Sequence, residues 1–112
     1  MAFTQQLHYE TIRTVDTSTL SGSYVALGTP LAHPASIVKL VNASNISLAV
    51  SVDGVNQHDI APATSFFLYD VTTNTPSQGD NAIFIPQGTQ YYVNGSDGTG
   101  DVYLVVQYIV QI

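Results

Sequence analysis

Alternation between apolar residues and their neighbours restricts most strongly what this sequence can fold into. The clearest example runs from Val102 to Ile112, where every second residue is Val, Leu, Tyr or Ile. Successive side chains of a β-strand point to opposite faces, so a period of two predicts strands rather than helices. No helical period competes with it elsewhere in the chain. The sequence therefore predicts an all-β protein.

The same pattern recurs between clusters of turn-forming residues. In the segment 65–71, Phe67, Tyr69 and Val71 would lie on one side of a strand, with Phe66 and Leu68 on the other. Further strands are expected at 6–15, 20–27, 36–41, 46–52, 55–60, 82–85 and 89–93. About eight short antiparallel strands separated by turns predict a jelly-roll-like β-sandwich or barrel.

The dipeptide Asp53-Gly54 separates two of these expected strands. A type I′ turn needs positive φ at both central residues, and Asp-Gly is among its preferred pairs. The sequence therefore predicts a tight hairpin, in which the strand 46–52 turns directly into the strand 55–60.

The length of the chain allows one domain. Its 112 residues match the usual domain size of about 100–150 residues. We expect residues 16–112 to form a single β-sandwich. The weaker pattern of residues 1–15 leaves two interpretations open, an edge strand of the sandwich or an arm that reaches a neighbouring subunit.

Charged residues are scarce, at 9% of the chain against about 25% in an ordinary soluble domain. Arg13 and Lys39 are the only bases, and the formal net charge is −6. This balance argues against binding to nucleic acid or to an anionic membrane, because both depend on clustered Lys and Arg. The N-terminus shows no secretory signal and no apolar run is long enough for a membrane helix, so we expect synthesis in the cytoplasm without export.

The common catalytic arrangements are missing from the sequence. There is no cysteine and no Gly-x-Ser-x-Gly motif, and the acidic residues are scattered singly. His58-Asp59 is the only histidine beside a carboxylate, but neighbouring residues of a strand point to opposite faces and form no dyad. We therefore expect a protein that is not an enzyme and uses no cofactor.

Two segments contain residues that could bind a ligand. Asp97 and Asp101 lie four apart in a Gly-rich loop, and calcium prefers such oxygen ligands, but the loop lacks the remaining ligands of an EF-hand. A solvated turn is the simpler interpretation. Tyr91 and Tyr92 could offer a ring for stacking on a sugar, although one of them must face inward if the segment is a strand.

Several motifs follow one another along most of the chain beyond residue 20. They are Y-x-x-L-G-x-P-L at 24–31, V-S-x-D-G at 50–54, P-A-x-S-F-x-x-Y-D at 62–70, F-I-P-Q-G-T at 84–89 and V-Y-L-V-V-Q-Y-I at 102–109. In this succession the chain resembles the small virion structural proteins of tailed bacteriophages, especially short-tailed ones.

The resemblance implies a capsid decoration, cement or minor capsid protein with a jelly-roll-like fold. Such a protein sits on the outside of the capsid, binds neighbouring major capsid subunits and stabilises the shell. Self-association as a dimer or trimer is also expected, because small proteins of this kind commonly form symmetric oligomers. Two alternatives stay open: a tail, head–tail or fibre-associated component, and a carbohydrate-binding β-sandwich.

Two segments are candidates for contact with a partner. One is the N-terminal segment, and the other is the outer face of the last strand, which is more apolar than solvent favours. The candidate contact residues are Phe3, Gln5, Leu7, Tyr9, Tyr103, Val105 and Ile109.

Overall fold

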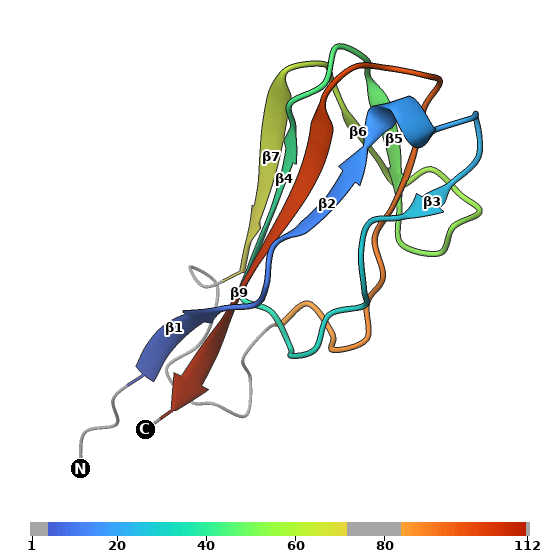
Figure 1. The fold of residues 1–112 in the computed structure, drawn as a ribbon. Coiled ribbons are helices and arrows are strands. Elements are labelled where there is room, and N and C mark those ends of the chain that lie inside the picture. The colour runs from blue at the N-terminus through green and yellow to red at the C-terminus, as the bar shows by residue number, and fades with distance from the viewer. Residues whose placement is uncertain (1–4, 72–83, 112) are drawn as a thin grey trace.

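The computed structural model describes residues 5–71 and 84–111, with the side chain of Gln111 left out. In this part of the chain there is no α-helix, and the all-β prediction is confirmed (Figure 1). The elements are β1 (Gln5–Tyr9), β2 (Arg13–Asp16), the short 3-10 helix η1 (Thr17–Thr19), β3 (Val25–Ala26), β4 (Ile37–Asn42), β5 (Leu48–Ser51), β6 (Asp59–Ala61), β7 (Ser65–Asp70), β8 (Tyr92–Asn94) and β9 (Asp101–Gln111). Among the described residues no helix is long and apolar enough to cross a membrane.

The strands form two antiparallel sheets that pack face to face. The five-stranded sheet has the order β1-β9-β4-β7, with β2 following β1 along the same edge of β9, and the four-stranded sheet has the order β3-β8-β5-β6. The pairs β2·β9, β3·β8, β4·β7 and β5·β6 are nested in the sequence, as in one long antiparallel ribbon. The folded ribbon closes through β4·β9 and β5·β8, which is the topology of a jelly roll.

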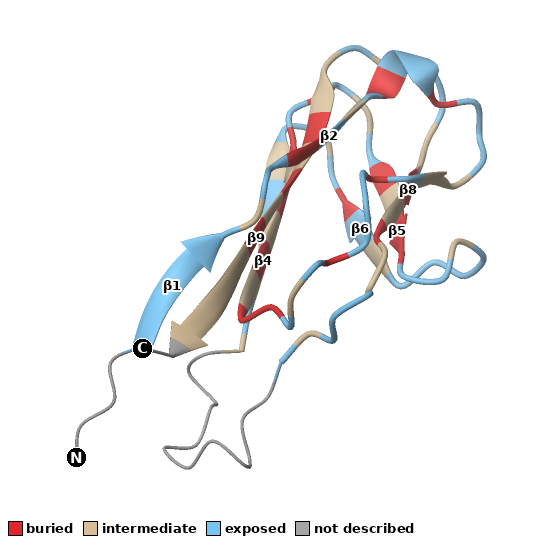
Figure 2. Ribbon diagram, turned by 60° about the horizontal axis from the view of Figure 1, so that its bottom comes forward, coloured by how far each residue is buried: buried red, intermediate tan, exposed pale blue. Residues whose placement is uncertain are grey.

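The core lies between the inner faces of the two sheets. Alternate residues of β4 and β9 point into it, and Val38, Leu40, Leu104 and Val106 are at most 1% exposed (Figure 2). Fully burying one such side chain contributes about 1.5–3 kcal/mol, so these alternating positions drive the sheets together. The other buried apolar residues are Leu20, Leu27, Leu31, Ala35, Leu48, Val50, Ala61, Tyr91, Val93 and Val102.

The C-terminal part of β9 extends beyond the four-stranded sheet. There it pairs with β1, and the two strands form a projecting ribbon near both chain ends (Figure 1). Every described residue of β1 is exposed, whereas the first half of β9 alternates with buried positions (Figure 2). The expected single strand at 6–15 is therefore two strands, both paired with β9 of the same chain.

A β-bulge separates β1 from β2. Tyr9 is opposite Gln107, and Arg13 is opposite Leu104. Between these two pairs the segment that joins β1 to β2 has three residues, whereas β9 has two. One extra residue exchanges the two faces of a strand. Leu7 therefore shares a face with Ile109 on the outside of the sheet, whereas Arg13 shares one with Leu104 in the core.

The predicted tight hairpin at Asp53-Gly54 is wrong. The return strand is only Asp59–Ala61, and a wide loop precedes it. Asp53 Oδ1 accepts from the backbone N–H groups of Val55 and Asn56, both at 2.8 Å. Ser51 Oγ accepts from the N–H of Gly54 at 2.9 Å. The N–H of Val55, which a tight hairpin would pair with the carbonyl of Val52, is thus bonded by a side chain within the loop.

Other predicted strands are shorter than expected. The segment 20–27 is a strand only at Val25–Ala26, although Leu20 and Leu27 are buried in the core from the turns on either side. Residues 82 and 83 lie outside the described part of the chain, and Ile85 forms a single bridge with Ala35. The strand expected at 89–93 is displaced to Tyr92–Asn94.

Candidate interaction surface

The surface of the five-stranded sheet that faces away from the core is unusually apolar; we call it the outer face. Residues that are opposite in a sheet register share a face, and the register sets Val41 beside both Phe66 and Tyr103. Phe66 and Leu68 are 65% and 50% exposed. The apolar and basic residues of the outer face are Leu7, Tyr9, Ile37, Lys39, Val41, Phe66, Leu68, Tyr103, Val105 and Ile109. The register also places the acidic residues Asp16, Asp70 and Asp101 on this face, at the ends of their strands.

The outer face contains residues of both segments that the sequence predicts as partner contacts. Leu7 of β1 is opposite Ile109 of β9, and Tyr9 is opposite Gln107. Gln5 extends this row toward the end of the sheet, opposite Gln111. Tyr103, Val105 and Ile109 are outward positions of β9 and are half-buried. Phe3 lies outside the described residues.

Four outward residues of β4 and β7 were missed as contact residues, namely Ile37, Val41, Phe66 and Leu68. A signal for them was present, because both segments alternate and Phe66 and Leu68 were already placed on one side of a strand. Only the pairing of β4 between β7 and β9 shows that this side continues the outward face of the last strand.

Lys39 is the only base on the outer face. Its register partners are Leu68 and Val105, so the ammonium group stands on an apolar surface. Within residues 5–71 and 84–111 its side chain has no hydrogen bond or ion pair. Its ammonium group is therefore available to form an ion pair with an acidic group of a partner.

The four-stranded sheet is covered differently on its outside. Its register places Ala49 beside Ile60 and Asn94, and Ser51 beside Tyr92. The loop after β5 returns over this end, where a Cβ built on Gly54 would lie 3.3 Å from the Tyr92 ring. Small residues and a loop of the same chain thus occupy part of this surface, where Ile60 is the large apolar residue that is exposed, at 54%.

A buried polar network joins the β1–β2 bulge to the segment before β4. Arg13 Nη2 donates to Glu10 Oε1 at 2.7 Å, and the two side chains are only 8% and 3% exposed. Arg13 Nε also donates to the carbonyl of Thr29 at 2.7 Å, and Nη2 donates to that of Pro30 at 2.9 Å. The guanidinium therefore fixes the bulge against residues 29–30.

Glu10 is held in its ionised form by this network. Burial by itself favours the neutral acid, but hydrogen bonds from Arg13, His33 and the backbone N–H of Ala32 outweigh it. The pKa of Glu10 consequently lies below its ordinary value. The role of this carboxylate is structural, because every contact it makes joins parts of the same chain.

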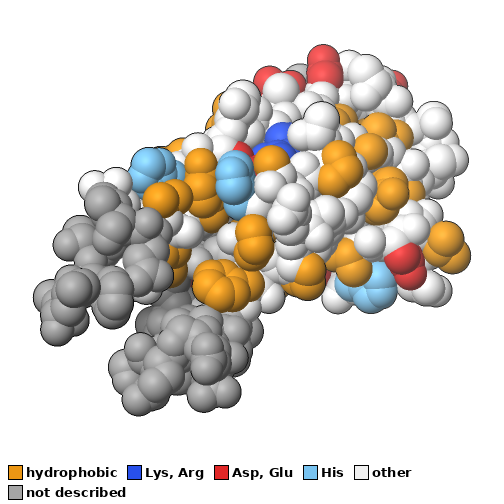
Figure 3. All heavy atoms as spheres, turned by 90° about the horizontal axis from the view of Figure 1, so that it is seen from below, with side chains coloured by type: hydrophobic (Ala, Val, Ile, Leu, Met, Phe, Trp, Pro, Cys, Tyr) orange, Lys and Arg blue, Asp and Glu red, His pale blue; other side chains and the backbone are white. Residues whose placement is uncertain are grey.

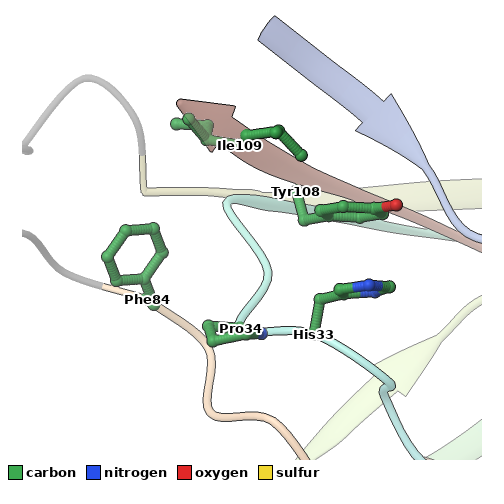
Figure 4. A pocket seen from close by; sticks show the side chains of 6 residues that line it. His33, Pro34, Phe84, Tyr108 and Ile109 are labelled. Atoms are coloured by element: carbon green, nitrogen blue, oxygen red, sulfur yellow. The ribbon is translucent and has the colours of Figure 1, made fainter. Parts of the chain in front are cut away.

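His33 connects the network to a small pocket on the projecting ribbon (Figure 4). Its Nδ1 lies 2.8 Å from Glu10 Oε2, and its ring stacks on Tyr108 with a centroid distance of 3.7 Å. The pocket has a volume of about 380 Å³ and is lined by His33, Pro34, Phe84, Tyr108, Ile109 and Val110. With one imidazole already engaged by Glu10, its walls offer mainly apolar contact.

The remaining sequence candidates do not converge on a reactive centre. His58 and Asp59 diverge, since His58 Nδ1 accepts from the N–H of Val52 while Asp59 accepts from the hydroxyl of Tyr69. Among the described residues no three His, Asp or Glu side chains could share a metal ion.

The two tyrosines that are candidates for stacking on a sugar are buried to different degrees. Tyr91 is 4% exposed and belongs to the core, and burial raises its pKa to about 12. Tyr92 is half-buried, with its ring close to Gly54. The ring of Tyr91 is therefore closed to a sugar, and the ring of Tyr92 is partly covered.

Hydrophobic side chains also spread over the side of the molecule shown in Figure 3, with few charged groups among them. A charge-poor surface of this kind is typical of a protein that is covered by a partner.

Comparison of the chain with models of protein families, with curated proteins and with solved structures gave no match.

Proposed function

We propose that this chain is a bacteriophage virion structural protein, a decoration protein that binds major capsid subunits on the outside of the capsid. Three features support the proposal: the succession of motifs between residues 24 and 109, the jelly-roll topology, and the scarcity of charge. Jelly rolls are common in capsid proteins, although a fold alone does not determine a function.

The observation that carries the proposal is the open, apolar outer face. Phe66, Leu68, Leu7 and Tyr9 are each at least 45% exposed and lie on one side of one sheet. Large contiguous apolar patches on soluble proteins usually mark a site of interaction. We therefore assign the outer face to the capsid, with Lys39 directed at an acidic group of the capsid subunit.

Binding alone would provide the function. Four strands about 4.8 Å apart and six residues rising about 3.3 Å each give a flat area of roughly 20 by 20 Å. A stable interface usually buries about 800 Å² on each partner, so one such face would hold a single subunit weakly. Attachment at several points raises the total affinity and would stabilise neighbouring subunits against one another.

The number of copies per particle tests this proposal. Quantitative mass spectrometry of purified virions should find the chain in a fixed, high ratio to the major capsid protein. A few copies per virion would contradict decoration of the capsid and would indicate a tail or head–tail component. Absence from purified virions would contradict both.

A further inference from the structure

Strand β7 lies at one edge of the five-stranded sheet and forms the longest apolar strand edge among the described residues. The four-stranded sheet ends in β3 and β6, which have only two and three residues. On its other side the five-stranded sheet ends in β1 and β2, whose sequences QQLHY and RTVD are mostly polar. Strand β7 has six residues with the sequence SFFLYD.

The backbone of β7 presents hydrogen-bonding groups along this edge. The N–H of Val71 donates to Ser36 at 3.0 Å, toward the β4 side. Backbone groups alternate in direction along an antiparallel strand, so those of Phe67 and Tyr69 also point toward β4. Those of Phe66 and Leu68 point away, and no described residue bonds to them.

This edge lacks the features that usually prevent strands from pairing with other chains. Natural edge strands carry Lys, Pro or a bulge, or are very short. From Ser65 to Asp70 there is no Lys, Pro or Gly, and the register with β4 is continuous over all six residues. The only charge is Asp70, at the last position.

We infer that β7 pairs with β7 of a second copy of this chain, antiparallel about a two-fold axis. With Phe67 at the axis, Phe66 lies opposite Leu68 of the second copy, and the groups that point away from β4 face each other. Asp70 then lies opposite Thr64, so no like charges meet across the ladder. An identical strand fits this edge because it is apolar in the same places and its one charge, Asp70, does not lie opposite another charge.

The pairing would join two five-stranded sheets into one continuous sheet of ten strands. The two outer faces would then lie side by side and double the apolar surface on one side of the dimer. The inference stands apart from the proposed function, because it concerns the purified chain without any capsid.

Sedimentation equilibrium of the purified chain tests the pairing. We expect the mass to rise from the 12.0 kDa of one chain to twice that value as the concentration is raised to about 1 mM. Leu68→Pro should return the mass to that of one chain, because Leu68 would lose an edge N–H that β4 does not use. The matched control Leu68→Thr keeps this N–H and should remain dimeric.

Amide hydrogen exchange gives a second measurement that needs no variant. The amides of Phe66 and Leu68 should become protected as the protein concentration rises, whereas those of Phe67 and Tyr69 should be protected throughout. A wild-type monomer over the whole concentration range would overturn the inference. So would protection of Phe66 and Leu68 that does not depend on concentration, or a folded Leu68→Pro variant that stays dimeric.

Discussion

The five-stranded sheet has apolar residues on both faces, but within residues 5–71 and 84–111 the rest of the chain covers only the inner one. On the inner face, Val106 and Leu104 of β9 are at most 1% exposed. One residue away, Val105 and Tyr103 face outward next to Val41 and Lys39 of β4. Alternation alone therefore identifies the two faces of a strand but does not say what covers each of them.

The two bases of the chain show the same contrast. Arg13 lies on the inner face, where its guanidinium donates to Glu10 and to backbone carbonyls. Lys39 lies on the outer face, and no described residue bonds its ammonium group. Arg13 thus serves the fold of this chain, and Lys39 is available to a partner.

The largest effect is expected from exchanging adjacent valines of β9 for lysine. Val106→Lys would bury an unpaired charge in the core and should cost about 5 kcal/mol of unfolding free energy or prevent folding. Val105→Lys on the outer face should cost less than about 1 kcal/mol. Urea unfolding of both variants measures the difference. If Val105→Lys unfolds the chain, the outer face belongs to the core.

Arg13→Met should have the next largest effect. Removing one partner of a buried ion pair leaves Glu10 uncompensated, at a cost of about 3–5 kcal/mol. The matched control on the other face is Lys39→Met, which should change the free energy of unfolding by less than about 0.5 kcal/mol. Equal losses in the two variants would contradict the contrast between the bases.

Gly28 tests how closely the chain packs around Arg13. Its φ of +72° is unfavourable for other residues, and an added Cβ would lie 2.6 Å from Arg13 Cβ. Gly28→Ala should cost about 2–3 kcal/mol, more than backbone strain alone. Gly88→Ala is the control, since Gly88 has a φ of +89° and open space around it, and it should cost about 1 kcal/mol. Thermal unfolding compares the two, and equal costs would argue against the close contact.

The pH dependence of stability gives a smaller effect from the same network. Because the pKa of Glu10 is lower in the folded chain than its ordinary value of 4.5, its ionised form stabilises the fold above that pH. This contribution should be lost as the pH falls below 4.5 toward the lowered pKa. Melting temperatures of the wild type and Glu10→Gln should therefore converge in acid. A constant difference between them would show that the charge of Glu10 is not responsible.

Much of the architecture follows from the sequence, because alternation is a local signal. It placed β4, β5, β7 and β9 close to their observed positions, and the number of short strands indicated a jelly roll. The hairpin at Asp53 was mispredicted, because its carboxylate and Ser51 bond the loop backbone in place of a second strand. Such local side-chain bonds compete with a β-ladder and leave no mark on the apolar pattern.

The assembly of the outer face could be predicted only in part. Its residues on β1 and β9 were identified separately, but their common face depends on the bulge between Tyr9 and Arg13. The weak pattern of residues 6–15 reflects that bulge, although a single sequence does not reveal where it falls. The network of Glu10, Arg13 and His33 joins residues up to 23 positions apart and has no local signature.

Binding of outer-face variants to capsid particles tests the central claim most directly. Purified chain, Val105→Lys and the control Val55→Lys would each be sedimented with particles that lack the protein. Val55 is 77% exposed in the loop after β5, away from the outer face. We predict that the wild type and Val55→Lys bind equally, whereas folded Val105→Lys loses at least tenfold in affinity. Undiminished binding of folded Val105→Lys would contradict the assignment of the outer face to the capsid.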